Sequence, residues 1–426
     1  MRILHLTPRY HPATGGGQTH ILQLSEHFVR AGHAVTVLTS DALDSAALWM
    51  PGKATIPELE TVHNGVRILR FPLRYLFNSR LGFPITHRLQ WMGSQAKIVP
   101  ERVLKGFGRL LPHLPTLFEW IKTTDETFDL VACMGLPFDA LMLAGQAFAK
   151  QHNIPFVAYP LTHFGAGNAP GSDHDSQFYT MRHQNSYIAA SDGLVAQTET
   201  EAAFYRGHGM ADERIIVAGP GITPEQVAGG DAARFRQKYG IEGDFILHIG
   251  LLAQVKGAVD NVRAVQKLRK QGVAVELVLV GGDTDGFYHF WGGMDSAEKA
   301  HIHKLGYLSE QDKKDALAAC NFFSMPSKMD SFGIVYLEAW LYEKAVIAAQ
   351  TWGVMDVVLD RHNGLTVPYG DSDALALAMR ELLENRELSA ELGRTGHQFA
   401  QYQTWAHIGD KILVFYEKLT ISHQQV

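Results

Sequence analysis

The chain has 426 residues, more than one hydrophobic core usually supports, so its length predicts two domains. Its apolar fraction of 46% and charged fraction of 19% are those of an ordinary globular protein. The net charge of -6, with both signs interspersed, argues against nucleic-acid binding. Cys133 and Cys320 are the only cysteines, which excludes a disulfide framework and a thiolate metal site.

The sequence also argues against a membrane-spanning protein and against a histidine metal site. Residues 1–7 form a strand-like pattern rather than a cationic start with a long apolar region. No run approaches the ~18–20 apolar residues of a membrane span, so a cytoplasmic location is expected. Of the 21 histidines only His301 and His303 are closely spaced. Without an HExxH motif or a cysteine partner, these two indicate surface residues, and no metal is expected.

The first forty residues predict a β-α-β unit. Residues 3–7 form a short apolar strand, residues 18–30 an amphipathic helix and residues 34–39 a second strand. Glycines at a helix start let an anion approach the backbone N–H groups closely. Gly16 and Gly17, which precede the helix, are therefore candidate anion-binding residues.

A dinucleotide-binding function is the alternative for this loop. Gly15-x-Gly17, followed by Asp41 after the second strand, partly matches the Rossmann fingerprint. However, His20 stands where the third glycine should be. The glycines also begin eight residues after Thr7, too far for the tight strand-to-helix turn of that fingerprint. A nicotinamide-dependent oxidoreductase is therefore the weaker interpretation.

The regular alternation is lost from about Phe71 to Trp120, here termed the 71–120 segment. Basic residues are interspersed there with Phe, Leu, Trp and Pro. One interpretation is a helical excursion that forms one side of a cleft or contacts an anionic membrane surface. The other is a pair of helices packed on the domain with a solvated basic edge. The sequence leaves both open.

Two polar residues follow predicted strands, at the edge where open α/β sheets bind their ligands. His163 comes after the strand at residues 156–160. Lys256 follows the strand at residues 245–250, which opens a second β-α-β series. The stretch 223–244 before it is rich in Gly, Ala and charged residues, and it is the predicted domain boundary.

Residues 324–353 combine a strand, a polar loop, an apolar helix and another strand. The helix, predicted over 332–342, is apolar on all sides and should be buried, yet it contains Glu338. A buried carboxylate needs a protein donor or ligand hydroxyls. Asp330 lies just before the helix start at Ser331-Phe332-Gly333, beside backbone N–H groups that the helix leaves unbonded. The alternatives are that Asp330 is only an N-cap and that Glu338 pairs with a buried Arg.

Together these motifs resemble the family 4 retaining glycosyltransferases of the GT-B fold, over essentially the whole chain. The resemblance rests on Pro8, Tyr10, Pro12, Gly15 and Gly16, on Lys256 and Gly257, and on Pro326, Ser327, Phe332, Gly333, Glu338 and Ala339. It implies an α/β fold with two doubly wound Rossmann-like domains that face each other across a cleft. The first domain would comprise residues 1–222 and a C-terminal helix at about 406–426, and the second residues 223–405.

The resemblance also implies an activity, that of a retaining, metal-independent hexosyltransferase that moves a sugar from a nucleotide sugar to an acceptor hydroxyl. No other cofactor is implied, and the first domain would bind the acceptor. The implied donor-binding residues are Gly16, Gly17, Lys256, Asp330, Ser331, Phe332, Gly333 and Glu338. The implied catalytic residues are His163, Lys256, Asp330 and Glu338. Lys256 and the glycine amides would stabilise the leaving diphosphate, while the two acids and the histidine would hold the ribose and the sugar.

The sequence departs from the family pattern at the expected phosphate site. Leu251 stands where the family has an Arg that clamps the diphosphate, and Asp330 is one methylene shorter than the usual Glu. Two alternatives follow: a glycosyltransferase-like binding protein without turnover, and a GT-B nucleotide-sugar epimerase. The expected partners are a nucleotide sugar and an acceptor, with peripheral contact to the inner face of an anionic membrane through the 71–120 segment.

Overall fold

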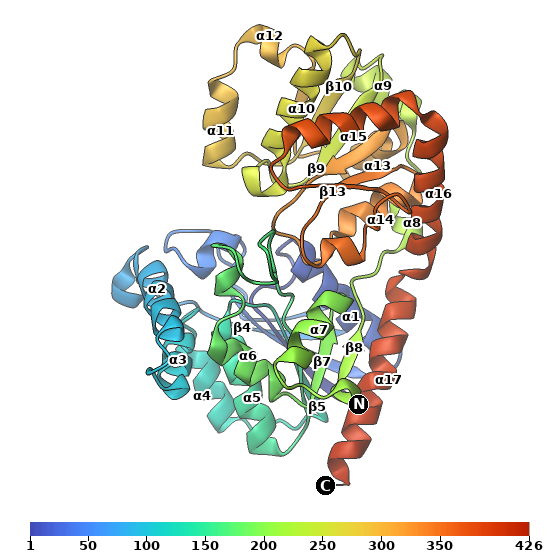
Figure 1. Ribbon diagram of the computed structural model, residues 1–426. Helices are drawn as coiled ribbons and strands as arrows, with labels where there is room; N and C mark the ends of the chain where they lie inside the picture. The colour runs from blue at the N-terminus through green and yellow to red at the C-terminus, as the bar shows by residue number, and fades with distance from the viewer. Residues whose placement is uncertain (426) are drawn as a thin grey trace. The chain divides into compact units, whose positions relative to one another are not determined.

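The computed structural model describes residues 1–425, whose contacts group into two compact units (Figure 1). The first unit comprises Met1–Thr162, His174–Gly219 and the chain from Trp405 onward. The second comprises His163–Asp173 and Pro220–Thr404. Each unit contains a parallel or mainly parallel sheet with helices packed against it, which confirms the predicted α/β class with two Rossmann-like sheets.

The sheet of the first unit has the strand order β3-β4-β2-β1-β5-β6-β7-β8, in which the edge strand β3 is antiparallel to β4 and the other pairs are parallel. Its inner strands are almost continuous apolar runs because helices cover the sheet, and every residue of β5 is buried. The bounds are β1 (Arg2–Thr7), β2 (Ala34–Ser40), β3 (Glu60–His63), β4 (Val66–Phe71), β5 (Leu130–Met134), β6 (Phe156–Tyr159), β7 (Gly193–Ala196) and β8 (Ile215–Val217).

Eight α-helices accompany this sheet in the described part of the unit. They are α1 (Gly16–Arg30), α2 (Gly82–Gln95), α3 (Glu101–Gly108), α4 (Pro115–Thr123), α5 (Asp139–His152), α6 (Arg182–Ala189), α7 (Glu199–Gly207) and α17 (Trp405–Gln424). The last helix packs against α1, and the hydroxyls of Tyr159 and Tyr416 lie 2.5 Å apart. The C-terminal helix is therefore built into the first unit.

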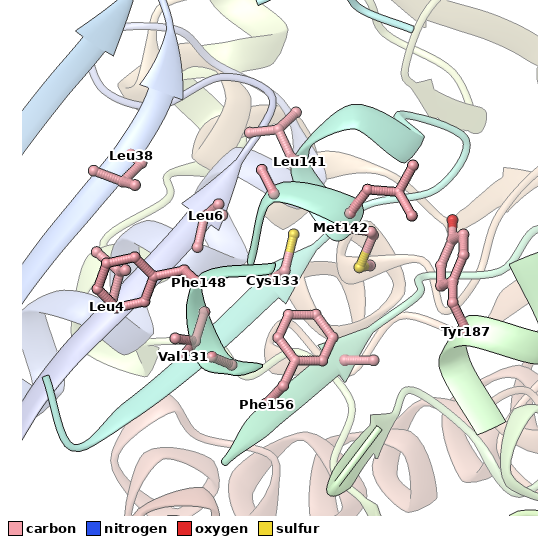
Figure 2. Close-up of a cluster of buried hydrophobic side chains, with 14 of the residues drawn as sticks. Leu4, Leu6, Leu38, Val131, Cys133, Leu141, Met142, Phe148, Phe156 and Tyr187 are labelled. Atoms are coloured by element: carbon pink, nitrogen blue, oxygen red, sulfur yellow. The ribbon is translucent and has the colours of Figure 1, made fainter. Parts of the chain in front are cut away.

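A core cluster lies between α5 and the strands β1 and β5 (Figure 2). Leu4 and Leu6 come from β1, Val131 and Cys133 from β5, and Phe148 from α5. All five side chains are fully buried. Burial also raises the pKa of the Cys133 thiol well above its ordinary value, which makes Cys133 a structural residue.

The sheet of the second unit has six parallel strands in the order β11-β10-β9-β12-β13-β14. The strands are β9 (Phe245–Ile249), β10 (Glu276–Val280), β11 (Ile302–Gly306), β12 (Phe322–Met325), β13 (Val346–Ala349) and β14 (Leu365–Val367). The helices are α8 (Pro224–Val227), α9 (Ala232–Tyr239), α10 (Ala258–Lys270), α11 (Asp285–Gly292), α12 (Ser296–Lys299), α13 (Glu310–Ala319), α14 (Ile334–Leu341), α15 (Ser372–Glu384) and α16 (Arg386–Tyr402).

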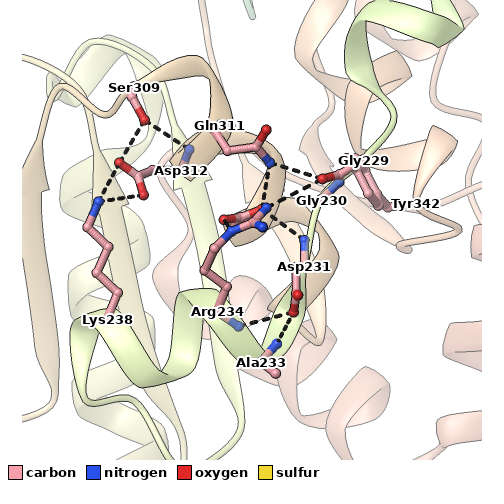
Figure 3. A network of polar contacts seen from close by, with 11 residues as sticks. Gly229, Gly230, Asp231, Ala233, Arg234, Lys238, Ser309, Gln311, Asp312 and Tyr342 are labelled. Atoms are coloured by element: carbon pink, nitrogen blue, oxygen red, sulfur yellow. Dashed lines mark hydrogen bonds and ion pairs between the residues drawn. The ribbon is translucent and has the colours of Figure 1, made fainter.

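A buried carboxylate fixes the start of the second unit to α13 (Figure 3). Asp315 accepts hydrogen bonds from Nη2 of Arg234 (2.6 Å), Nε2 of Gln311 (2.9 Å) and the backbone N–H of Asp231 (2.8 Å). The hydrogen bond from Arg234 is the main cause that lowers the pKa of Asp315 far below its ordinary value. Charged and backbone donors thus hold α9 against α13.

The structure corrects the extent and the environment of the helix predicted over residues 332–342. The helix α14 starts at Ile334, because Gly333 has a left-handed backbone with φ of 89°. It is not apolar and buried on all sides, since Ile334, Val335 and Glu338 are partly exposed. Only one face of α14 packs into the core, so Glu338 is not an isolated carboxylate in an apolar interior.

Candidate active site

The candidate site lies at the carboxyl edge of the second sheet, in the loops that follow β9 and β12. These two strands are neighbours in the sheet, so their loops meet at the edge where open parallel sheets bind ligands. The contact between the loops is close at Gly257, where a Cβ atom would lie 2.6 Å from the carbonyl oxygen of Pro326. Gly257 also has φ of 78°, so glycine is required at this position for two reasons.

This contact brings Lys256 and Asp330 together. Nζ of Lys256 donates to Oδ2 of Asp330 (2.8 Å) and to the carbonyl oxygen of Met329 (2.9 Å). The side chains of Lys256 and Asp330 are 23% and 17% exposed, so the pair is largely shielded from water. Burial opposes ionisation of Asp330, but the ammonium of Lys256 outweighs it and the pKa of Asp330 is lowered. The site is therefore an ion pair with one lysine N–H left for a ligand.

His163 lies close enough to this pair to respond to both charges. Its pKa is lowered to about 4, mainly by burial and further by the positive charge of Lys256, while Asp330 acts in the opposite direction. The loop around His163 is fixed within the second unit by Trp352, whose backbone N–H donates to the carbonyl oxygen of Gly165 (3.0 Å). The indole Nε1 of Trp352 donates to the carbonyl oxygen of Gly167 (2.8 Å). Residues 163–173, placed in the first domain from the sequence, thus group with the second unit.

Glu338 is predicted to bond hydroxyl groups of a ligand, but in the structure it is bonded to a side chain of the protein. Its Oε1 accepts a hydrogen bond from Nζ of Lys313 on α13 (3.0 Å), and its side chain is only 16% exposed. Nζ of Lys313 is also 3.2 Å from Glu310. Burial opposes the charge of Lys313, but the two carboxylates raise its pKa above the ordinary value. The alternative in which Glu338 pairs with a basic residue therefore describes the structure, with Lys in place of the expected Arg.

The residues at the start of α14 do not have the predicted cap. The residue at the N-cap position is Gly333, which provides no side-chain hydrogen bond, so Asp330 is not the N-cap. Phe332 is buried in the core, whereas Ser331 and Gly333 are partly exposed. The first N–H groups of α14 are consequently uncapped by side chains, as a ligand at this helix end would need.

The two glycines of the candidate site belong to the other unit. Gly16 and Gly17 are the first two residues of α1, and Gly15 before them makes no side-chain cap. The helix thus begins two residues earlier than the sequence predicted. Their N–H groups lie at a helix start in the first unit that no side chain caps, while the other predicted site residues lie in the second.

Sequence reasoning missed a buried polar cluster behind Lys256. Nδ1 of His248 in β9 lies 3.2 Å from the carbonyl oxygen of Ser324, to which Nδ2 of Asn261 also donates (2.9 Å). The pKa of His248 is lowered to about 4, mainly by burial. Its Nε2 has no hydrogen-bond partner among the described residues. The available signal was a histidine inside the otherwise apolar strand FILHI.

A second lysine of the site loop was also missed. Lys328 lies two residues before Asp330, and its backbone N–H donates to the carbonyl oxygen of Val255, next to Lys256. Its Nζ is 3.6 Å from Oδ2 of Asp173. The side chain of Leu251, at the position of the family's Arg, is exposed at the start of the neighbouring loop. The edge of the sheet therefore carries two ammonium groups, although the Arg is absent.

No group of three or more His, Cys, Asp or Glu side chains is arranged to hold a metal ion in residues 1–425. In the same residues, none of the helices has both the length and the hydrophobicity that crossing a bilayer requires.

Two Rossmann-like sheets, one in each unit, are the architecture of the GT-B class of fold. The solved structure of Anabaena HepE in complex with UDP has this fold: it superposes with a TM-score of 0.68 over 98% of this chain and 100% of that chain, at 17% identity. Residues 15–221 match the glycosyl transferase 4-like domain, and residues 231–399 match the glycosyl transferases group 1. The chain belongs to the family 4 (group 1) glycosyltransferases.

Curated relatives carry the same kind of name. The D-inositol 3-phosphate glycosyltransferase of Stackebrandtia nassauensis is 27% identical over 297 residues, which span 64% of this chain and 66% of that protein, just under two thirds of its length. The enzyme of that name from Xylanimonas cellulosilytica is 25% identical over 450 residues, which span 99% of this chain and 96% of that protein.

Proposed function

We propose that the protein transfers a hexosyl group from a nucleotide sugar to an acceptor hydroxyl with retention of the anomeric configuration. The observation that carries the proposal is the Lys256–Asp330 pair at the carboxyl edge of the second sheet, beside the uncapped start of α14. This combination offers an ammonium and helix N–H groups to a diphosphate, and a carboxylate to sugar hydroxyls. The glycosyltransferase relatives and the UDP complex of HepE support a nucleotide-sugar donor.

The proposed mechanism assigns a task to each residue of the site. Lys256 bonds the diphosphate and stabilises the charge that develops as the glycosyl bond breaks. Asp330 orients the sugar hydroxyls, and His163, uncharged at neutral pH because of its lowered pKa, contacts the sugar as a neutral hydrogen-bonding group. The departing diphosphate accepts the proton of the attacking acceptor hydroxyl. Lys256 supplies positive charge at the diphosphate, so the proposed reaction needs no divalent cation.

Glu338, Gly16 and Gly17 complete the proposed donor site. Glu338 would bond the ribose hydroxyls, and for this its carboxylate must be shared with Lys313 or released from it. The N–H groups of Gly16 and Gly17 would bond phosphate oxygens at the start of α1. The acceptor would bind in the first unit. We also propose a cytoplasmic location with peripheral contact to an anionic membrane through the 71–120 segment.

A thermal-shift series with UDP-, GDP- and ADP-glucose tests donor binding and identifies the base. A ligand that binds the folded state raises the melting temperature by mass action, so at 100 times its Kd the expected stabilisation is about 2.7 kcal/mol. The matched control is Lys256→Met, which should lose the shift. If no nucleotide sugar shifts the wild-type protein, the proposed donor class is wrong.

A binding protein without turnover is the second candidate, and Leu251 in place of the family's Arg favours it. The arms of one experiment separate the two functions. A protein that is stabilised by a donor and releases nucleotide faster when an acceptor is added is a transferase. The acceptors tested are inositol phosphates and lipids with free hydroxyl groups. If a donor stabilises the protein but nucleotide release does not exceed that of Lys256→Met with any acceptor, the protein is a binding protein.

A further inference from the structure

The helix α2 is inverted relative to an ordinary surface helix. Its residues that face the first unit are small or polar: Gly82, Thr86, Gln90 and Ser94 are the buried ones. Its outer face carries large aliphatic side chains: Leu81, which precedes the helix, and Ile85, Leu89 and Met92 are between 49% and 59% exposed. Their spacing of four, four and three residues places them on one face of the helix. The aromatic residues Phe83 and Trp91 are partly buried.

The inverted helix is fixed to the unit by polar contacts. Nε2 of Gln90 donates to Oδ2 of Asp139 (2.7 Å) and lies 3.1 Å from the carbonyl oxygen of Leu104. Asp139 is fully buried at the start of α5, where His183 (2.8 Å) and the hydroxyl of Tyr187 (2.9 Å) also contact its carboxylate. Contacts of this kind to a buried carboxylate hold a helix in one orientation. The apolar face of α2 is therefore presented outward by a defined structure.

A second anchor fixes the end of the helix. Nε of Arg182 donates to the carbonyl oxygen of Ser94 (3.0 Å), and its Nη2 donates to that of Gly93 (3.2 Å) and contacts that of Val99. The guanidinium thereby satisfies carbonyl groups that the helix leaves unbonded. Arg182 therefore also holds the corner between α2 and α3, and the side chains of that corner point to solvent.

The exposed apolar face continues beyond α2 and is surrounded by one sign of charge. Ile98, in the corner between α2 and α3, is 92% exposed, and Val103 on α3 is exposed as well. Arg88, Lys97 and Arg102 are exposed beside these residues. Between residues 72 and 118 seven basic residues stand against a single acid, in a chain whose net charge is -6. A basic belt around apolar side chains complements an anionic lipid surface.

We propose that this face, here termed the α2 face, inserts among the acyl chains of an anionic bilayer. It consists of Leu81, Ile85, Leu89, Met92 and Ile98. The apolar side chains would enter the acyl region while Arg88, Lys97 and Arg102 contact the headgroups. The inference rests on the proposed function in one respect: a transferase docked in this way takes an acceptor that is itself anchored in the bilayer.

Vesicle flotation with the full chain tests the proposal. The probes are phosphatidylcholine vesicles with and without 30% phosphatidylglycerol, at 0.1 M salt. We expect binding to the anionic vesicles and a loss of at least tenfold in the partition constant for Ile85→Ser/Leu89→Ser/Met92→Ser. The control is Val414→Ser/Ile421→Ser on α17, which removes equally exposed apolar residues (65% and 58%) and should bind like the wild type.

A charge variant tests the basic belt separately. Arg88→Glu/Lys97→Glu/Arg102→Glu should also reduce binding to the anionic vesicles at least tenfold, and 0.5 M salt should weaken wild-type binding because it screens the headgroups. Circular dichroism confirms that each variant is folded. Since all substituted side chains are exposed, their replacement removes no core contact.

Three results would overturn the proposal. The first is that the wild-type protein does not bind anionic vesicles, and the second is that the α2 variant binds them as well as the wild type. The third is that the wild type does not bind vesicles but forms a concentration-dependent dimer, which the α2 variant abolishes. The last result would assign the α2 face to a second copy of the chain. The vesicle assay contains no nucleotide, so its failure is distinguishable from failure of the donor thermal-shift series. For the acceptor class, donor turnover should rise when a lipid-linked acceptor is supplied in the anionic vesicles, and stimulation by a water-soluble acceptor alone would refute it.

Discussion

Replacement of Lys256 by Met is the sharpest test of the proposed site. The change keeps most of the side-chain length and removes the ammonium that lies 2.8 Å from Asp330. Two of its three N–H groups are already bonded to Asp330 and Met329, so the donor would use the third and compete for the others. Removal of one preorganised group that stabilises developing charge costs ~10²–10³ in rate, or about 2.7–4 kcal/mol. We expect kcat/KM of Lys256→Met to fall by this factor.

The same variant has a calculable side effect on stability. Asp330 would lose its ammonium partner while remaining largely buried, and breaking a fully buried pair costs about 3–5 kcal/mol. Because both side chains retain some exposure, we expect less, on the order of 1–3 kcal/mol in denaturant unfolding. The double variant Lys256→Met/Asp330→Asn removes the uncompensated charge. It should recover stability but not activity, which separates the two effects.

Nucleotide release with a matched donor provides the assay, and Lys328→Met is the matched control in the same loop. Lys328 already faces Asp173, so its loss should cost less than tenfold. The reasoning is refuted if Lys256→Met keeps kcat/KM within threefold of the wild type. If Lys328→Met costs more than Lys256→Met, the second lysine holds the phosphates and replaces the missing Arg.

Four further predictions follow from the described contacts. Glu338→Gln should weaken donor binding at least fivefold and leave the fold intact, whereas Lys313→Met should tighten donor binding by freeing the carboxylate of Glu338. Titration calorimetry with the matched donor measures both affinities. Unchanged affinities would mean that the pair has a structural role only. Transfer should persist in EDTA, and a loss that magnesium restores would contradict the proposed role of Lys256. Asp315→Ala should destabilise the second unit by about 1–3 kcal/mol in urea, because the backbone N–H of Asp231 loses its acceptor. A change below 1 kcal/mol would show that the network is dispensable. Each unit contains two histidines whose pKa is lowered to about 3 or 4, so they bind protons only on unfolding; the four are His5, His20, His163 and His248. The free energy of unfolding of each unit should therefore fall from pH 6.5 towards pH 4 by up to about 3 kcal/mol per pH unit. Equilibrium unfolding at pH 7, 6 and 5 measures this, and a flat profile would refute it.

The fold could be predicted from the sequence because its strands are buried on both sides. Runs such as LVACM and FILHI have no alternation, and their order with amphipathic helices specifies parallel sheets. The meeting of Lys256 with Asp330 was equally accessible, since both follow strands at one edge of a sheet. Neither inference required knowledge of distant contacts.

The rest depended on contacts between segments that the sequence does not pair. Nothing near Glu338 in the chain indicates Lys313, which approaches from another helix, and the apolar composition around Glu338 suggested a deeper burial than α14 has. The periodicity of α2 misleads in the opposite way, because its apolar face is the exposed one. Burial there is decided by Gln90 and its buried partner Asp139, 49 residues away.

The attachment of residues 163–173 to Trp352 has a consequence for how the protein can be divided. The chain crosses between its units after Thr162, Asp173, Gly219 and Thr404. A fragment that starts at Pro220 and ends at Thr404 would contain all six strands of the second sheet together with Lys256 and Asp330, but it would lack the peptide that carries His163. If recombination exchanges this unit between homologues, residues 163–173 must be transferred as well, in a second and separate exchange. Only then does Trp352 meet the carbonyl groups to which it is hydrogen-bonded.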